Sequence, residues 1–308
     1  MHFFGDVPLI LKTLPLEEAK VERTPKAEVI KAADEDFDFA IKYLKAKPSD
    51  VGRASLGAAW AFKARMYLYE KRWEEAAAAA KEVMDLGVYD LYDDYEALFE
   101  EENENNIEVI FDLQYMKNLR AQPWPSTCLN YTEWPTAGVT LNIIDQYYMK
   151  DTGKPITDAT SGYNINRPLD NRDPRMEATF VLPGSRFVGG MIYIPANLET
   201  EVQTSVRPRK YADIDNTDRG NCGLNIILMR YADVLLMRAE GLIESGDTSD
   251  EIYDLINKVR QRKTVEMPKI EDVEGTNLGT AELRNILRHE RRVEFAFEFT
   301  RYSDMRRW

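Results

Sequence analysis

The sequence predicts a mainly α-helical protein in which tetratricopeptide-like helical hairpins are interrupted by a long irregular, partly β insertion. Three observations indicate this fold class. Two helical segments pair near the start of the chain, and an amphipathic segment at helical spacing closes it. Between them, residues 115–223 show little sustained period. With 308 residues, 44% of them hydrophobic, the chain is long enough to bury a full core.

The first helix is predicted to begin after Thr24-Pro25 and to run to about residue 44. Threonine is a common helix cap, and proline is tolerated at the first helical position because its missing N–H has no partner there. The predicted buried face of this helix carries Val29, Ala33, Phe37, Ala40, Ile41 and Leu44.

A helical hairpin of tetratricopeptide type is predicted next. Ser55 is expected to cap its first helix, which runs to about Lys71, and the alanine-rich second helix opens at Trp73 and stops at Gly87. Four residues fall at the W…G…Y…A spacings of that repeat: Trp60, Ala64, Tyr67 and Ala76. Lys63 stands where the repeat has a leucine. Small residues of this kind allow paired helices to approach closely, and stacked pairs bury one continuous core.

The remaining elements alternate between irregular and helical character. Residues 107–114 predict a strand, and the irregular stretch after it holds one helix, following Thr140. A weaker helical pair is predicted over residues 225–262, broken at 244–247, and residues 275–280 form a surface linker. We therefore divide the chain into a helical part with a strand (24–114), a loop-rich excursion that is expected to bind ligand (115–223) and a C-terminal helical part (224–308).

The last predicted helix carries carboxylates inside an apolar face. Its stripe at helical spacing consists of Leu283, Ile286, Leu287, Glu290, Val293, Glu294 and Phe297. A buried carboxylate destabilises a protein by several kcal/mol, on the order of its whole net stability, unless it is paired and hydrogen-bonded. We therefore expect Glu290 or Glu294 to meet a guanidinium from another helix, with Arg238 or Arg260 as the predicted partner, in a structural ion pair rather than a catalytic site.

Composition argues against several classes of function. The net charge of −13 disfavours nucleic acid and anionic lipid, both of which select basic surfaces. No apolar run approaches the roughly 18 residues of a membrane-spanning helix. The two histidines, His2 and His289, do not suggest a triad or a metal cluster, and His289 is expected on a helix surface. Neither a cofactor nor a metal is expected, and spacing does not decide whether Cys128 and Cys222 are paired.

Aromatic residues within the irregular stretch suggest carbohydrate binding. A sugar ring has a flat face of C–H groups and a rim of hydroxyls, which match an exposed aromatic ring flanked by amides and arginines. The Trp-Pro pairs stiffen their loops and reduce the entropy lost on binding. The predicted ligand residues are Trp124, Asn130, Tyr131, Trp134, Tyr163 and Tyr193, with Asn164, Asn166 and Arg167 beside them in sequence. The alternative for each aromatic residue is that it attaches a loop to the helical scaffold.

Several strings of the sequence resemble the SusD/RagB family. They are GDVPLI at the start, the stretch 52–68, WPTAGVTLNIIDQYYMKDTGKPI, NRDPRMEATFVLPG, RYADVLLMRAEGL, INKVRQR and HERRVEFAFEFTRYSDMRRW, in the family's order. The resemblance covers nearly the whole chain and implies one SusD-like domain over residues 1–308. Members of that family are lipid-anchored, surface-exposed nutrient-binding proteins of diderm bacteria.

The resemblance implies non-catalytic binding of an oligosaccharide or polysaccharide nutrient and its delivery to a SusC-like TonB-dependent transporter. It implies a location at the cell surface on the outer membrane. The family also carries an export signal, an acylated cysteine and a leading helical portion, which residues 1–6 do not match. The chain is therefore expected to be an internal part of a longer protein, whose membrane contact would run through an anchor outside this sequence.

Two other functions remain open at the level of sequence. A tetratricopeptide-type scaffold that binds only proteins would explain the helical pairs equally well, although it assigns no purpose to the aromatic excursion. A glycosidase requires two carboxyl groups facing each other across a cleft roughly 5–10 Å wide. Glu290 and Glu294 lie one helical turn apart on one face, which is the geometry of a structural network.

Overall fold

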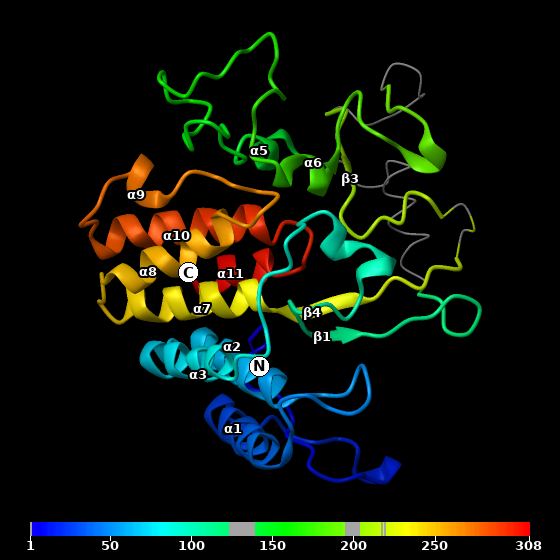
Figure 1. Cartoon of the computed structure of the whole chain (residues 1–308). Coiled ribbons are helices and arrows are strands. Elements are labelled where there is room, and N and C mark those ends of the chain that lie inside the picture. Colours follow the sequence, from blue (N-terminus) through cyan, green and yellow to red (C-terminus); the bar gives the residue numbers. More distant parts are fainter. Residues whose placement is uncertain (1, 123–138, 195–203, 217, 219) are drawn as a thin grey trace.

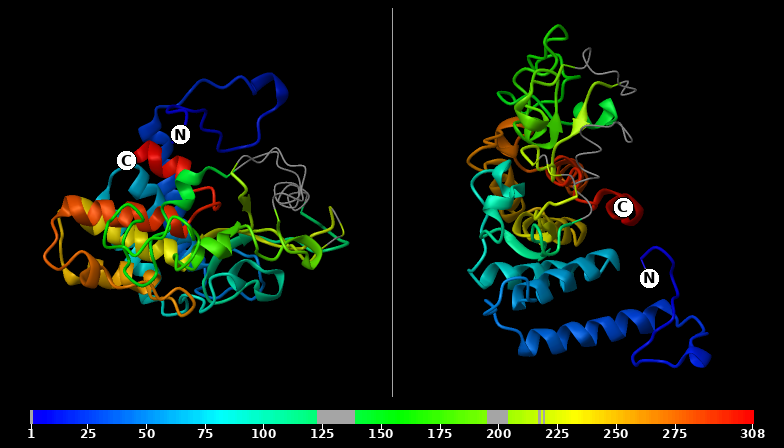
Figure 2. Two further views of the ribbon diagram at one scale, coloured as in Figure 1. Left: turned by 90° about the horizontal axis from the view of Figure 1, so that it is seen from above. Right: turned by 90° about the vertical axis from the view of Figure 1, so that its right-hand side faces the viewer.

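The computed structural model describes residues 2–122, 139–194, 204–216, 218 and 220–308. Its main body is a stack of helices: α1 (Lys26–Tyr43), α2 (Leu56–Tyr69), α3 (Trp73–Asp85), α7 (Tyr231–Glu244), α8 (Asp250–Arg260) and α10 (Thr280–Glu294). In Figure 1 and Figure 2, α1 is the outermost layer, and α2 and α3 lie between it and α7. The green segment around α5 and α6 covers the opposite end. The mainly helical fold that the sequence predicts is confirmed.

Helix α7 is the centre of the stack, because it contacts α3 on one side and α8 and α10 on the other. Twelve of its residues are buried, which is why its sequence is apolar around most of the helix. Gly241 allows the closest approach: a Cβ atom there would lie 2.7 Å from the carbonyl oxygen of Trp73 and 2.9 Å from the Cβ of Ala77. The predicted pair of helices in this region is present, but β4 precedes it.

The tetratricopeptide-like hairpin forms as the sequence predicts, within about two residues at each end. Ser55 caps α2, since its hydroxyl oxygen accepts a hydrogen bond from the Ala58 amide at 3.0 Å. The first helix is capped differently from the prediction. Asp6, rather than Thr24, accepts the hydrogen bond of the Lys26 amide at 2.8 Å, so the chain's first residues close the helix end.

Helix α10 ends at Glu294, so Phe297 is not the last member of its apolar stripe as predicted. Phe297 and Phe299 both have φ near +62°, in the left-handed region, which ends the helical path. The last carbonyl groups of α10 are bonded by side chains: Val293 accepts from the Tyr147 hydroxyl at 3.1 Å and Glu294 from the Tyr95 hydroxyl at 2.6 Å. A short helix, α11 (Arg301–Arg307), follows.

The β structure consists of two small antiparallel pairs. Strand β1 (Val109–Leu113) pairs with β4 (Ile226–Arg230), and β2 (Phe180–Val181) pairs with β3 (Arg207–Pro208). The predicted strand at 107–114 corresponds to β1. Because β4 leads directly into α7, the small β1–β4 sheet ties the start of the excursion to the central helix (Figure 1).

The described parts of residues 115–223 are mostly irregular, as predicted. They contain α5 (Leu141–Ile144), α6 (Arg175–Thr179), β2, β3 and the 3-10 turn η4 (Val188–Gly190). Elsewhere, 3-10 turns η1 (Leu16–Glu18), η2 (Ala97–Phe99) and η3 (Glu101–Asn103) and the short helix α9 (Ile270–Val273) complete the fold. Among the described residues, no helix has the length and apolar character needed to span a bilayer.

Candidate functional site

A buried ionic network joins the excursion to the helical scaffold. It contains five carboxylates and five cations: Glu108, Asp173, Glu290, Glu294 and Glu298, with Arg175, Lys210, Arg230, Arg260 and Arg262. Asp173, Arg175 and Lys210 belong to the excursion, and the other members come from the scaffold. The equal numbers matter, because a buried charge is tolerated only when it is paired and hydrogen-bonded.

Glu294, which is 0% exposed, lies at the centre of this network. Its carboxylate accepts hydrogen bonds from Arg230 at 2.7 Å, Arg175 at 2.8 Å and Arg262 at 3.1 Å. Burial by itself raises the pKa of the Glu294 carboxyl, but these guanidinium groups outweigh burial and hold the pKa well below its usual range. Glu294 is therefore an ionised structural anion that joins β4, α6 and the segment just after α8.

Of the two alternative partners that the sequence predicts, Arg260 makes the contact. Arg260 donates to Glu290 at 3.1 Å, in the arrangement expected between two helices. Arg238 requires a correction: it donates to Glu251 of α8 at 2.5 and 2.8 Å and to the Ala77 carbonyl at 3.0 Å. Arg238 therefore lies on the side of α7 that packs against α3 and α8 rather than on the side that meets Glu290 and Glu294.

Three arginines of the network were missed as partners in the sequence. Arg175 begins the five-residue helix α6 and Arg262 follows the end of α8, so no sustained helical period indicates the direction of either side chain. Arg230 is the last residue of β4, whereas the sequence pattern predicts a helix at this position. The usable signal was their position inside the strings that resemble the SusD/RagB family, since those strings contain all three.

A second ionic cluster holds the chain's end against the scaffold. Asp233 of α7 accepts from Arg291 at 2.7 Å and from Arg65 at 2.6 Å, while Arg307 of α11 donates to Glu240 of α7 at 2.8 Å. Burial raises the pKa of Asp233, but Arg291 and Arg65 outweigh burial and hold it well below its usual range. The cluster thus fixes α2, α7, α10 and α11 relative to one another.

Of the predicted ligand residues, four lie outside the described residues: Trp124, Asn130, Tyr131 and Trp134. Tyr163 is half-buried, and the guanidinium carbon of Arg172 lies 5.8 Å from the centre of its ring. Arg172 itself is held by the carbonyl oxygens of Ile144 and Tyr147, at 2.7 and 2.8 Å. The ring of Tyr163 is therefore supported from beneath by an immobilised cation.

Tyr193 requires a correction, because it is 0% exposed and does not present a ring to solvent. Its ring packs against that of Phe187, with 5.3 Å between centroids, and Arg207 donates to its hydroxyl at 3.3 Å. Tyr193 thus attaches its loop to the protein interior, which is the alternative to ligand binding given above for each aromatic residue. The neighbouring Ile192 is 58% exposed instead.

A cavity of about 780 Å³ opens in the excursion a few residues after Tyr163. It is lined by residues from Leu169 to Ser185, on either side of α6. Its polar lining includes Asn171, whose amide donates to Asp151 at 2.9 Å, and Glu177. The cavity and Tyr163 make this lobe the natural place for a ligand among the described parts of the excursion.

His289 and Cys222 both have contacts within the protein. His289 stacks on Tyr148 at 4.0 Å between ring centroids, and its Nε2 lies 2.7 Å from the Gln146 carbonyl oxygen. It is partly buried rather than a free surface residue, and burial lowers its pKa. Cys222 is a buried free thiol, and Cys128 lies outside the described residues.

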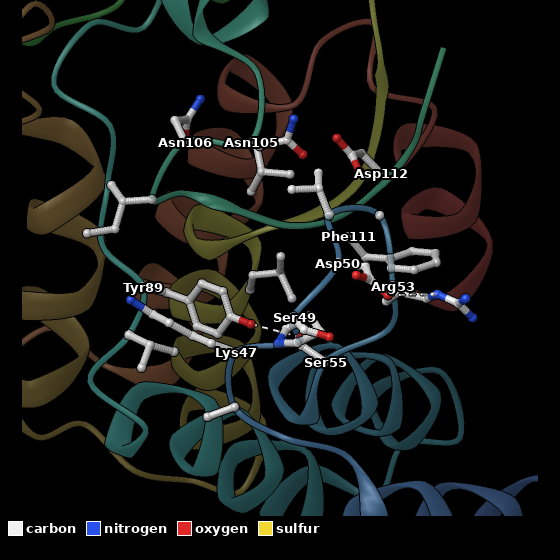
Figure 3. Close-up of a pocket in the computed structure, with 18 residues that line it drawn as sticks. Lys47, Ser49, Asp50, Arg53, Ser55, Tyr89, Asn105, Asn106, Phe111 and Asp112 are labelled. Atoms are coloured by element: carbon white, nitrogen blue, oxygen red, sulfur yellow. Dashed lines mark hydrogen bonds and ion pairs between the residues drawn. The ribbon is translucent and has the colours of Figure 1, made fainter. Parts of the chain in front are cut away.

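A second cavity, of about 490 Å³, lies on the helical scaffold between residues 46–55 and β1 (Figure 3). Tyr89, Asn105 and Asn106 line it from the segment that joins α3 to β1, and Lys47 and Arg53 line it from the loop between α1 and α2. Among the excursion residues that the structure describes, none lines this cavity.

Comparisons with known proteins agree with the fold and with the resemblance in sequence. The model of the SusD family matches residues 96–308, more than half of the chain. SusD-like protein P2 of Formosa agariphila is 26% identical over all of this chain and 61% of its own length. A SusD-like carbohydrate-binding protein of Bacteroides fragilis is 29% identical, with a TM-score of 0.85 over 99% of this chain and 63% of that structure.

A second SusD-like structure from Bacteroides fragilis is also 29% identical, with a TM-score of 0.81 over 99% of this chain and 64% of that structure. The chain thus spans about three fifths of the length of the relatives that it matches. The matched residues include all ten members of the buried ionic network. The chain belongs to the SusD family.

Proposed function

We propose that this protein binds an oligosaccharide or polysaccharide nutrient at the cell surface, leaves it intact and delivers it to a SusC-like TonB-dependent transporter. The observation that carries the proposal is membership of the SusD family, together with a 29% identical relative described as a carbohydrate-binding protein. The loop-built lobe joined to a rigid helical scaffold supports it, since a preorganised surface loses less entropy on binding.

Binding without cleavage is favoured by the state of the buried carboxylates. A glycosidase needs one carboxylic acid with a raised pKa that can protonate the leaving oxygen. Glu294 has a lowered pKa and three guanidinium partners, and Glu290 is 0% exposed between Arg175 and Arg260. These groups hold the fold and have no route to a substrate.

The proposed ligand surface is the excursion. It combines the half-buried ring of Tyr163, the exposed polar residues Asn164, Asn166 and Arg167 and the cavity after them. Trp124, Asn130, Tyr131 and Trp134 are proposed as further contacts. A ring backed by Arg172 is a firm platform for the C–H face of a sugar, and amides and a guanidinium suit its hydroxyl rim.

Titration calorimetry against a panel of neutral and acidic glycans tests the proposal. Saturable binding is expected, and we expect Tyr163→Ala, Trp124→Ala and Trp134→Ala each to weaken it about tenfold, because a buried aromatic contact contributes on the order of 1 kcal/mol or more. Phe39→Ala is the matched control, since Phe39 is 67% exposed on α1, away from the excursion.

Three results would contradict the proposal. Indifference to every glycan combined with capture of a soluble protein partner would favour the tetratricopeptide-type scaffold instead. Release of reducing ends from a bound glycan would show that the protein is an enzyme. Copurification with a transporter only after deletion of the excursion would contradict the proposed arrangement, in which the scaffold faces the transporter and the loops face the ligand.

A further inference from the structure

Three partly exposed arginines of α10 and α11 form what we call the arginine row: Arg288, Arg292 and Arg301. Arg288 and Arg292 are one helical turn apart on α10, so their side chains leave the same face of that helix. The guanidinium carbons of Arg288 and Arg301 lie 4.9 and 5.5 Å from the centre of the Trp308 ring. The indole N–H of Trp308 donates to Glu240 at 2.7 Å, so the ring that supports these two side chains is itself fixed.

The carboxylates around the arginine row are already paired with other cations. The second ionic cluster is balanced, with three carboxylates against three arginines: Asp233, Glu240 and Asp304, with Arg65, Arg291 and Arg307. Glu244 accepts two hydrogen bonds from Arg284, at 2.6 and 2.9 Å, and lies 4.0 Å from Arg288. The arginine row is therefore a local surplus of positive charge in a chain whose net charge is −13.

The donors of the arginine row are mostly unused within the part of the chain that the structure describes. Arg301 forms neither a hydrogen bond nor an ion pair there, and Nε of Arg288 is buried without a hydrogen-bond partner. Arg292 makes a single hydrogen bond among these residues, to the side chain of Asn142. Burial and the neighbouring Arg292 lower the pKa of the Arg301 guanidinium. An oxyanion would supply the missing acceptors and the missing negative charge.

The arginine row adjoins the proposed ligand surface through the four-residue helix α5 (Figure 1). This helix holds Asn142, which bonds Arg292, and at its last residue a carbonyl oxygen that accepts from Arg172 at 2.7 Å. The guanidinium carbon of Arg172 lies 5.8 Å from the centre of the Tyr163 ring. Asp145, the exposed carboxylate that follows α5, forms no ion pair with the arginine row. A ligand on Tyr163 that extends past α5 would therefore reach these arginines.

We propose that the arginine row binds sulfate or phosphate ester groups of a glycan that also occupies the excursion. Arginine presents planar forks of donors that match an oxyanion, and a row of arginines suits a polymer with repeated charges. A membrane of anionic lipid is disfavoured as the occupant, because the net charge of −13 opposes the approach of the whole protein. The inference rests on the proposed function and deepens it, because it names the class of glycan.

Calorimetry with oligomers of κ-carrageenan and chondroitin sulfate, each paired with its desulfated form, isolates the ester because the two members of a pair share one backbone. A sulfated oligomer is expected to bind more tightly than its desulfated form. Arg292→Gln with Arg301→Gln should weaken the sulfated oligomer about tenfold and leave the desulfated one unchanged. Raised salt should reduce the difference within a pair. The control is Lys31→Gln with Arg53→Gln, which removes two cations, 78% and 77% exposed, from α1 and the loop after it.

The folding of the variants is checked separately, because no carboxylate depends on Arg292 or Arg301 for its charge partner. The melting temperature of Arg292→Gln with Arg301→Gln should stay within about 2 °C of that of the wild-type protein. If this double variant does not fold, Arg292→Lys with Arg301→Lys takes its place. Lysine keeps the charge but lacks the planar fork, so the sulfated oligomer should bind about threefold more weakly to this variant.

The outcomes separate this inference from the proposed function. If glycans bind and depend on Tyr163 but each sulfated oligomer binds like its desulfated form, the ester site is refuted and the proposed function stands. Equal weakening by the control pair would show that total charge explains the binding, and the assignment of the arginine row would be wrong. If vesicles that contain phosphatidylglycerol bind through these arginines and no sulfated oligomer does, the row takes lipid phosphate instead. If no glycan of any kind binds, the proposed function fails together with the inference.

Discussion

Replacing Glu294 with glutamine removes one negative charge from the centre of the buried network with little change in side-chain volume. Three guanidinium groups, at 2.7, 2.8 and 3.1 Å, then face a neutral amide. The amide also places an N–H₂ group against at least one arginine, where two donors meet. The network of five carboxylates and five cations is left with an excess positive charge that has no access to water.

The expected cost follows from the burial of the partners. Arg175 and Arg230 are each 1% exposed and Arg262 is 3% exposed, so water does not compensate the lost charge. Removing one partner of a buried ion pair destabilises a protein by about 3–5 kcal/mol. For a domain of this size each kcal/mol corresponds to about 2 °C, which predicts a fall in melting temperature of about 6–10 °C.

Differential scanning calorimetry and urea unfolding of Glu294→Gln measure this effect. Asp85→Asn is the matched control, because it breaks the Lys81 ion pair, in which Asp85 is 55% exposed, and should cost about 0.5 kcal/mol or less. Adding Arg262→Gln to Glu294→Gln restores the balance of charge. The double variant should therefore be less destabilised than the sum of the two single variants.

The reasoning would be refuted if Glu294→Gln unfolded within about 1 kcal/mol of the wild-type protein, close to the surface control. Additive effects of Glu294→Gln and Arg262→Gln would refute the narrower claim that their charges compensate each other across the 3.1 Å contact. In either case the excursion would be held to the scaffold by its apolar contacts instead.

Two further predictions concern the helical core. Gly241→Ala should destabilise the protein by about 1–3 kcal/mol in urea unfolding, because the new Cβ would lie 2.7 Å from the carbonyl oxygen of Trp73. The control is Gly279→Ala, whose Cβ would meet one side-chain oxygen at 3.6 Å and which should change the unfolding free energy little. Asp233 has a folded-state pKa far below its unfolded value near 3.9, because Arg291 and Arg65 outweigh the effect of burial. The stability that the Asp233 carboxylate contributes is therefore complete above about pH 4 and is lost as the pH falls below that value. The difference in unfolding free energy between the wild-type protein and Asp233→Asn should therefore shrink below pH 4, and a constant difference down to pH 2 would contradict this assignment.

The helices could be predicted from sequence because their signals are local. Ser55 caps the start of α2. The alanine run of α3 favours a helix, because alanine loses no side-chain entropy when the helix forms. The end of α10 could not be predicted, since Tyr95 and Tyr147 bond its last carbonyls from segments distant in sequence. The predicted cap of α1 was wrong for the same reason: the actual acceptor, Asp6, lies 20 residues before Lys26 and outside the helical pattern.

The candidate site was predictable only in outline. The need for buried guanidinium partners followed from two carboxylates in an apolar stripe, but their identity depended on the path of irregular segments and of β4. Arg238 was a reasonable choice by helical spacing, yet the packing of α7 against α3 and α8 turns it toward Glu251. The burial of Tyr193 likewise depends on Phe187 and Arg207, whose directions no period specifies.

The strings that reveal the family are the ones that build the network. Asp173 and Arg175 stand in NRDPRMEATFVLPG, Arg230 opens RYADVLLMRAEGL, and Glu294 lies in HERRVEFAFEFTRYSDMRRW. A buried charge in such a network cannot be exchanged alone, because each single loss leaves a partner unpaired at a cost of about 3–5 kcal/mol. An exposed aromatic or lysine side chain can change without that cost, as surface substitutions usually stay within about 0.5 kcal/mol. The resemblance therefore reports the scaffold and the attachment of the excursion, whereas the specificity for the proposed sugar ligand would be encoded in residues that are free to differ between members with the same fold.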